Sequence, residues 1–469
     1  MTFSSDYKQN KKDLEQALRI TESFDLICKN TVIGGKDSCF FFVDGMTKDE
    51  VMQKLLSGFY AIAESDMPEN AYDFSVKQLP YVEVDVVCDL TQTVTNILSG
   101  MTAILIDGYD AAICMDVRTY PARSVEQPEK EKVLRGSKDG FVETIVFNTA
   151  LIRRRIRDPH LTMEMLSVGD ISHTDVVLCY IENKVDKELL NVIRRKIQNI
   201  HTSSLNMNQT SLAECLYERK WYNPFPKYKY TERPDTSAAS ILEGSLVILV
   251  DNSPSAIILP TSLFGIMEEA DDYYLPPITG TYLRLTRFII SIVTFFITPT
   301  ILLLTMYPEW IPEWLSFIKL QEYTNVPLLF QFLILEIAVD GLKLAAVNTP
   351  SMLSTPLSII AGLALGEYAV SSGWFNAEAM LYMAFVALSN YTQPSYELGY
   401  ALKFFRIITL ILTGFFGLWG LIAGTISLLT ALLLNHTIDG RRRYLYPLIP
   451  FNWKVLKRQL FRFRRDENS

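Results

Sequence analysis

The stretch from Phe404 to Leu434 is 31 residues long and holds a single charged side chain, Arg406. A helix needs about 20 mostly apolar residues to cross the roughly 30 Å hydrocarbon core of a bilayer. A soluble core does not require so long an uncharged run. The sequence therefore predicts membrane-spanning helices, and this run closes a wider apolar region that begins at Phe288.

Five apolar segments make up this region: 288–306, 326–347, 353–370, 379–392 and 404–434. Arg284 and Arg287 precede the first, and nine basic and two acidic residues follow the last, from Arg441 onward. Because positive flanks stay in the cytoplasm, we expect both flanks there and an even number of crossings. Five apolar segments conflict with an even number of crossings, so one segment is not a single full crossing. The last segment, 404–434, would be about 46 Å long as one helix, which is longer than the hydrocarbon core is thick. We therefore expect four to six crossings.

The chain as a whole predicts an α/β N-terminal domain followed by an all-α multi-pass membrane domain. Residues 1–235 form the cytoplasmic α/β domain, with two subdomains joined by the Pro- and aromatic-rich connector 222–235. Residues 236–283 form a hairpin and a connector to the membrane, 284–440 the transmembrane domain, and 441–469 a basic cytoplasmic tail.

The net charge of −8 divides into −12 for residues 1–283, −3 for 284–440 and +7 for 441–469. An acidic soluble domain argues against nucleic acid as a partner, since phosphate binding needs clustered Lys and Arg.

All six cysteines precede the apolar region without metal-ligand spacing, which predicts free thiols, no metal and no cofactor. The polar N-terminus predicts no signal peptide. No catalytic triad or phosphate loop is present, so we expect no enzyme.

Two hairpins in the α/β domain share one pattern. Apolar runs turn at Asp107-Gly108 and again at Asp251-Asn252, with residue types typical of tight turns. The likeness indicates either a duplicated α/β unit or two hairpins that use the same turn chemistry, and the second interpretation is the simpler one.

Residues 137–157 predict a helix with Asp139 as its N-cap. Four arginines at its C-terminal end, 153, 154, 155 and 157, suit either lipid headgroups or the negative helix end together with salt bridges. The second interpretation is the simpler one.

Two sets of residues in the membrane domain are candidates for an ion pathway. Glu336, Asp340 and Lys343 lie on one face of a predicted helix, and ionisable groups at that depth face protein or water. They form either a buried Asp340–Lys343 ion pair or part of an aqueous path. The second set is a helical stripe of small and polar residues that suits tight packing or a pore wall: Ser351, Thr355, Ser358, Gly362 and Gly366.

Several long motifs resemble the GerA-type spore germination A-subunit family, and most closely its stage V sporulation protein AF branch. They include TYPARSVEQPE, ALIRRRIRDP, DVVLCYI, PSAIILPTS, TPSMLSTPLSIIAGLALGEYAV, TQPSYEL and YPLIPFN, within residues 20–455. Where nutrient-receptor members read like FE-x-LREAG-x-R-x-P, this chain reads LEIAVDGLKLAAVNTP.

The resemblance implies a cytoplasmic domain on a multi-pass domain in the spore inner membrane. It also implies a ring-shaped homo-oligomer that releases cations early in germination, with other membrane subunits as partners. The departure from the receptor motif favours a channel acting downstream of nutrient receptors. A secondary transporter and a membrane-anchored scaffold remain as alternatives. A transporter would show saturable flux that requires a gradient, and a scaffold would show no flux.

Overall fold

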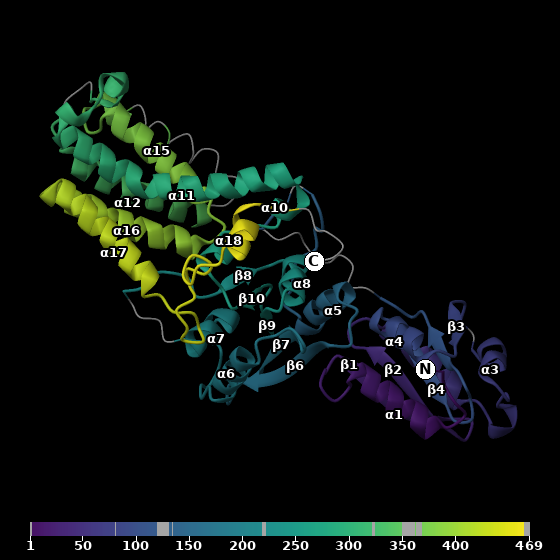
Figure 1. Ribbon diagram of the computed structural model, residues 1–469. Helices are drawn as coiled ribbons and strands as arrows, with labels where there is room; N and C mark the ends of the chain where they lie inside the picture. The colour runs from purple at the N-terminus through teal and green to yellow at the C-terminus, as the bar shows by residue number, and fades with distance from the viewer. Residues whose placement is uncertain are drawn as a thin grey trace. The chain divides into compact units, whose positions relative to one another are not determined.

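The computed structural model describes residues 2–79, 81–119, 131–133, 135–217, 222–320, 324–348, 362 and 368–463. The chain divides into two compact units (Figure 1). Unit 1 comprises Met1–Glu218 and Tyr228–Pro260, and unit 2 comprises Arg219–Lys227 and Thr261–Ser469. Unit 1 is α/β and unit 2 is helical, which confirms the coarse fold class expected from the sequence.

Unit 1 contains the same order of elements twice. The first half consists of α1 (Tyr7–Leu18), β1 (Leu26–Ile33), β2 (Lys36–Val43), α2 (Asp49–Tyr60), η1 (Glu64–Asp66), α3 (Ala71–Lys77), β3 (Val84–Val87), α4 (Leu90–Leu98), β4 (Thr102–Ile106) and β5 (Ala112–Met115). The second half consists of α5 (Ile145–Arg155), β6 (Leu161–Val168), β7 (Thr174–Ile181), α6 (Lys187–Gln198), α7 (Asn208–Leu216), β8 (Lys229–Thr231), α8 (Pro234–Leu242), β9 (Leu246–Val250) and β10 (Ala256–Leu259).

The two antiparallel sheets also share one strand order. The first runs β1-β2-β4-β5-β3 and the second β6-β7-β9-β10-β8. Ile104 pairs with Ile113 in the first central hairpin, and Ile248 pairs with Ile257 at the equivalent place in the second. The repeated order and register favour a duplicated α/β unit over two unrelated hairpins. That outcome reverses the preference drawn from sequence.

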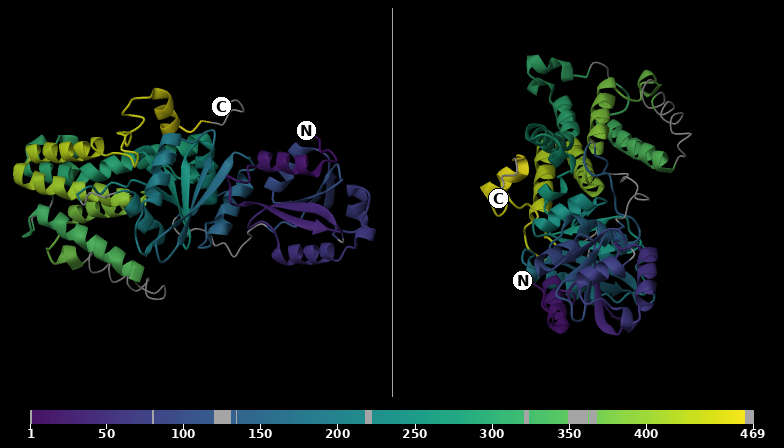
Figure 2. Two further views of the ribbon diagram at one scale, coloured as in Figure 1. Left: turned by 90° about the horizontal axis from the view of Figure 1, so that it is seen from below. Right: turned by 90° about the vertical axis from the view of Figure 1, so that its right-hand side faces the viewer.

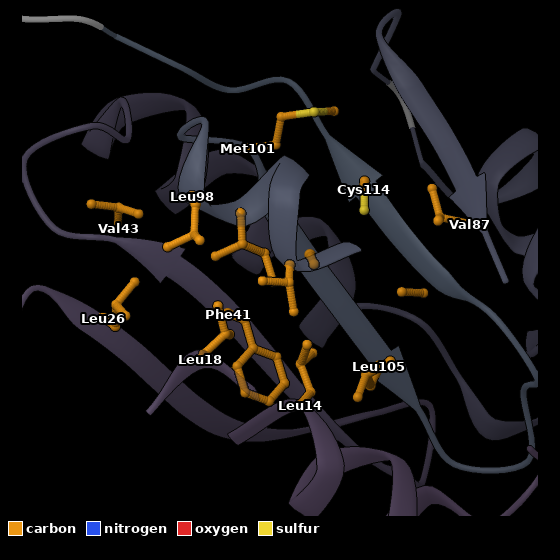
Figure 3. Packing of buried hydrophobic residues seen from close by; sticks show 14 of the residues in the cluster. Leu14, Leu18, Leu26, Phe41, Val43, Val87, Leu98, Met101, Leu105 and Cys114 are labelled. Atoms are coloured by element: carbon orange, nitrogen blue, oxygen red, sulfur yellow. The ribbon is translucent and has the colours of Figure 1, made fainter. Parts of the chain in front are cut away.

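The first sheet is covered by helices on both faces, which explains its uninterrupted apolar strands. Successive side chains of a strand point to opposite faces. Leu105 therefore packs with Leu14 of α1 and Leu98 of α4 (Figure 3). Ile104 packs on the other face, with Phe59 of α2 and α3 beside it. Every residue of β4 is buried as a result.

A buried ion pair joins the two halves of unit 1. The Asp25 carboxylate, just before β1, accepts hydrogen bonds from Arg153 of α5 at 2.7 and 3.0 Å. Arg153 also donates to the Ser23 hydroxyl and to the Leu161 carbonyl. Both charged side chains are at most 1% exposed. The guanidinium donates a fifth hydrogen bond to the Asp158 carbonyl at 3.2 Å. Its five hydrogen bonds thus connect the segment before the first sheet to the start of the second.

The helix expected over 137–157 is shorter than predicted, and the prediction of Asp139 as its N-cap was wrong. Helix α5 begins at Ile145 after Thr144, and Asp139 instead pairs with Arg155 at 2.5 Å. Arg153 and Arg155 therefore serve ion pairs within unit 1. This outcome favours the salt-bridge interpretation of these two arginines over headgroup binding.

Unit 2 is built from helices of very different lengths that run side by side (Figure 2). Its short elements are α9 (Leu263–Ile266), α10 (Asp271–Tyr274), η2 (Pro308–Trp310), η3 (Glu313–Ile318), α14 (Ala369–Ser371) and α18 (Trp453–Leu460). Its long elements are α11 (Pro277–Met306), α12 (Leu328–Asn348), α15 (Ala377–Tyr391), α16 (Tyr396–Phe416) and α17 (Leu418–Leu433). Among the described residues, α11 and α16 are long and apolar enough to cross a membrane, and α17 is apolar but shorter.

The two ends of unit 2 are distinguished by their side chains. At the basic end, the start of α11 meets the tail: Arg284 donates to the Gln459 carbonyl at 2.7 Å, and the Arg462 amide donates to Thr281 at 3.0 Å. At the aromatic end, Tyr307 stacks on Trp310. We keep the names basic end and aromatic end for these two places.

Contacts along the long helices give their directions. Helix α11 runs from the basic to the aromatic end. Helix α16 runs the same way, because Gln393 before it bonds to Ser291 and Gly417 after it packs on Tyr307. Helices α12 and α15 run back in parallel: the Asn376 amide donates to Gln331 near their starts, and Lys343 lies over Tyr391 near their ends.

The run 404–434 is two helices rather than one. Gly417, at φ +57°, ends α16 and reverses the chain into α17. A Cβ at Gly420 would lie 1.9 Å from the Leu412 carbonyl oxygen, and one at Gly424 would overlap Thr409. The glycines therefore let the two backbones pack in direct contact, as small residues do between membrane helices.

We predict that Asp25→Ala destabilises unit 1 by about 3–5 kcal/mol, because Arg153 is left buried without its carboxylate. Urea unfolding of the detergent-solubilised chain, followed by hydrogen exchange in α5 and β6, measures the loss. Asp110→Ala, at an exposed position, should change stability by less than about 0.5 kcal/mol. Equal effects of the two substitutions would mean that the ion pair does not hold the halves together.

Candidate functional site: a buried charge cluster between α12 and α16

Helices α12 and α16 bring opposite charges together inside unit 2. Glu336 and Asp340 are four residues apart on α12, so they lie on one face a turn apart. Helix α16 presents Lys403 and Arg406, three residues apart, toward that face. Four ionisable groups thus meet between two largely apolar helices.

Glu336 and Arg406 form the most deeply buried part of the cluster. The Glu336 side chain is 3% exposed and that of Arg406 is fully buried. Arg406 Nε donates to Glu336 Oε1 at 2.8 Å, and its Nη2 lies 2.6 Å from the same oxygen. Removing one partner of such a pair leaves an uncompensated buried charge, so this pair fixes α16 against α12.

Lys403 bridges the two acidic residues. Its ammonium lies 3.2 Å from Glu336 Oε2 and 2.5 Å from Asp340 Oδ2, and it donates to the Glu336 carbonyl at 3.0 Å. Lys403 is 4% exposed, whereas the Asp340 side chain is 31% exposed. Asp340 therefore marks the side of the cluster that is open within this chain.

The Asp340–Lys343 ion pair, one of the two interpretations left open by the sequence, is not among the ion pairs of the described residues. Asp340 pairs with Lys403, which approaches from a neighbouring helix. The Lys343 ammonium lies 5.0 Å from the ring centre of Tyr391 and 5.8 Å from that of Tyr400. Aromatic faces attract cations, so two rings take the place of the predicted carboxylate.

A small open depression adjoins the cluster, with about 250 Å³ of empty space that includes open solvent. Residues from three helices line it: Lys343, Asn390, Tyr396, Gly399, Tyr400 and Lys403. Two lysines and several polar groups thus surround a hollow between α12, α15 and α16. Such a lining can hold water next to the buried charges.

The sequence prediction found half of this cluster. Glu336, Asp340 and Lys343 were expected to share a face, while Lys403 was missed. Arg406 stood out only as the single charge of its run, and that isolation was the available signal, because a buried cation needs a partner. Ser351, Thr355, Ser358 and Gly366 lie outside the described residues. Gly362 has helical backbone, and no described residue places a non-neighbouring atom within 4 Å of where a Cβ would lie.

A second ionic cluster lies at the basic end. Asp272 is fully buried beside both arginines that precede the apolar part of α11. Arg284 Nε lies 3.3 Å from Asp272 Oδ2, and Arg287 Nη1 donates to the same oxygen at 3.0 Å. Arg287 also donates to the Met267 carbonyl at 2.7 Å. These arginines, expected only as flanking charges, anchor α10 to the start of α11.

The connector of the sequence, 222–235, begins inside unit 2. Phe225 stacks on Phe405 of α16 at 5.5 Å between ring centres. The buried Lys227 side chain hydrogen-bonds to Asn435, just after α17, and to the His436 carbonyl. Residues 222–227 are thereby held by the helices, and the chain enters unit 1 at Tyr228.

One chain thus combines a duplicated α/β unit with a helical unit in which, among the described residues, two helices are long and apolar enough to cross a membrane. A family model described as Bacillus/Clostridium GerA spore germination protein matches residues 12–468. The chain therefore belongs to the GerA family of spore germination proteins.

Two relatives and one solved structure illustrate the relationship. Stage V sporulation protein AF of Bacillus subtilis is 36% identical over 455 residues, which cover 97% of this chain and 92% of that protein. Spore germination protein A1 of Bacillus subtilis is 30% identical over 349 residues, 74% of this chain and 72% of that protein. The N-terminal domain of the A subunit of the Bacillus megaterium germinant receptor GerK3 matches with a TM-score of 0.42 and 22% identity, over 55% of this chain and 96% of that domain.

Glu336→Leu is expected to destabilise unit 2 by about 3–5 kcal/mol, because Arg406 then stays buried without a carboxylate. Thermal unfolding of the detergent-solubilised chain provides the measurement. Adding Arg406→Leu should restore most of the loss, since a well-packed apolar pair replaces the ionic one. If the double variant is as unstable as the single one, the pair is not the main contact between α12 and α16.

Proposed function

We propose that this chain is the membrane subunit of an oligomeric ion channel that releases cations from the spore core during germination. One observation supports it above the others. The cluster around Glu336 extends from a fully buried ion pair to partly exposed charges beside a polar hollow. Ionisable groups at membrane depth face protein or a water-filled cavity, and this cluster offers both.

The two parts of the cluster suit two tasks. Glu336 and Arg406 neutralise each other and pack the helices. Asp340 and Lys343 lie on the open side and are proposed to face an aqueous path. The sequence-derived stripe of Ser351, Thr355 and Ser358 remains a proposed second wall of that path, in the region outside the described residues.

An assembly is proposed because apolar side chains in the C-terminal half of α12 are exposed in the described part of one chain. Ile337 is 74% exposed, Leu344 64% and Val347 84%, and these residues flank Asp340 and Lys343. In a symmetric ring, each subunit can place the same helix beside a common axis. Neighbouring copies would then cover the apolar residues and bring equivalent charges around one path. Other membrane subunits of the germination apparatus are proposed as further partners.

An even number of crossings is proposed from the two ends of unit 2. The start of α11 and the tail meet at the basic end. Positive residues stay in the cytoplasm, so this end and unit 1 are assigned to the cytoplasmic side of the spore inner membrane. Helices α12 and α15 run in the same direction, so the count depends on the connection between them, most of which lies outside the described residues.

Asp340→Asn is expected to reduce cation flux through the reconstituted assembly by about fivefold, the effect of one charge a few ångströms from an ion in a largely aqueous path. Potassium release from proteoliposomes measures it. Leu429→Ala, at a 51% exposed position of α17 outside the cluster and the proposed subunit contact, serves as a control and should leave flux nearly unchanged. In the same assay, leucine at position 355 or 358 should block flux, and substitutions at Leu357 or Ile360 should not.

Three results would overturn parts of this proposal. Unchanged flux in an intact Asp340→Asn oligomer would exclude the charge cluster from the path. Saturable flux that requires an opposing gradient would indicate a secondary transporter. A correctly assembled protein without any flux would indicate a scaffold.

Single cysteines placed at position 12, which is exposed, and at position 465 should both resist labelling by a membrane-impermeant maleimide in intact protoplasts and react after lysis. The background must lack Cys88 and Cys215, the exposed natural cysteines. A cysteine at Trp314, at the aromatic end, should react from outside. Labelling of either terminus in intact cells would contradict the even number of crossings.

A further inference from the structure

Helix α18 and its flanks carry an exposed surface of aromatic and basic side chains. Phe451 is 67% exposed, Trp453 59%, Phe461 40% and Phe463 51%. Three exposed basic residues lie among them: Lys454, Lys457 and Arg458. We call these seven residues the aromatic-basic surface. The opposite side of the helix packs inward through the buried Leu456.

The aromatic-basic surface is held in place at the basic end of α11. Arg284, buried in α11, donates to the carbonyls of Arg458 and Gln459 at 3.3 and 2.7 Å. The Arg462 amide donates to the Thr281 hydroxyl at 3.0 Å, and the Arg462 side chain donates to the Leu275 carbonyl. Helix α18 therefore lies against the first turns of α11 and is not a free tail.

These turns correspond to the headgroup layer. Thr281 and Arg284 precede Phe288, the first residue of the apolar run, by four to seven residues, which is about 6–10 Å along a helix. At the other end of the run, Tyr307 lies 20 residues beyond Arg287, or about 30 Å. Exposed Trp310 and Trp314 follow it. Aromatic side chains thus flank one hydrocarbon thickness on both sides, as at membrane interfaces.

We propose that residues 451–463 lie on the bilayer surface at the basic end and bind anionic lipid headgroups. The aromatic rings enter the interface, and Lys454, Lys457 and Arg458 contact the phosphates. Basic residues combined with aromatic ones are typical of helices that lie in the plane of the membrane surface. The inference requires that α11 crosses the membrane but does not require that the protein conducts ions.

The charge of the aromatic-basic surface favours lipid over a protein as its binding partner. No acidic residue occurs between Tyr444 and Phe463, so the surface presents one sign of charge. An anionic leaflet supplies many negative groups at the depth where α11 places the helix. Each basic side chain near such a leaflet strengthens association about fivefold.

Hydrogen exchange of the full chain in nanodiscs tests the proposal. One set of nanodiscs contains phosphatidylcholine alone, and the other a three-to-one mixture with phosphatidylglycerol. Exchange in 451–463 is expected to slow by at least about tenfold in the mixture. One molar salt should remove most of the difference, because it shortens the screening length to about 3 Å. Residues 313–318, at the aromatic end and without basic side chains, should exchange equally in both.

The variant K454Q with K457Q and R458Q should lose the difference between the two bilayers. Its integrity is checked by size-exclusion chromatography and by unchanged exchange in α11. Equal exchange of the unaltered chain in both bilayers would overturn the proposal and leave the surface for a protein partner. A difference that persists in the triple variant would overturn the assignment of these three cations.

Discussion

The contact between Glu336 and the pair Lys403 and Arg406 is the interaction on which the helical unit depends. Two cations and one carboxylate are removed from solvent between apolar helices. Each of these charges would be costly alone. Helix α12 therefore has one favourable position against α16, and the rest of the bundle must fit that position. Asp340 and Lys343, a turn or two further along α12, are placed by the same constraint.

The α/β unit obeys a different constraint, since its sheets are held by apolar layers and joined by a buried ion pair. The same order of helices and strands occurs twice, with the central hairpins in the same register. The Asp107 amide bonds to the Asp37 carbonyl, and the Asp251 amide bonds to the Asp175 carbonyl, at the equivalent turn. Because each copy folds around its own sheet, the two copies need contacts that fix one against the other. The ion pair between Arg153 and Asp25 is such a contact.

Both proposals for the helical unit rely on where charge meets apolar surface. In the interior, paired charges with one open side suit an ion path shared between subunits. At the basic end, Arg284 and Arg287 form ion pairs with Asp272 and hydrogen bonds to backbone carbonyls. The outward-facing lysines of α18 are the charges that we propose to contact lipid. Membrane-flanking arginines can thus build structure while their neighbours contact lipid.

Sequence alone determined the apolar lengths, the asymmetry of charge, the two turns at Asp107 and Asp251, and the shared face of Glu336 and Asp340. Each is a local property that follows from helix or strand period and residue type. The tertiary structure decided the partners. Lys403 rather than Lys343 neutralises Asp340, because α16 brings it within 2.5 Å. Gly417 rather than its neighbouring glycines ends α16, because Gly420 and Gly424 are needed where the two helices touch. The strand order that reveals the duplication is likewise a property of pairing across the chain, which no single segment encodes.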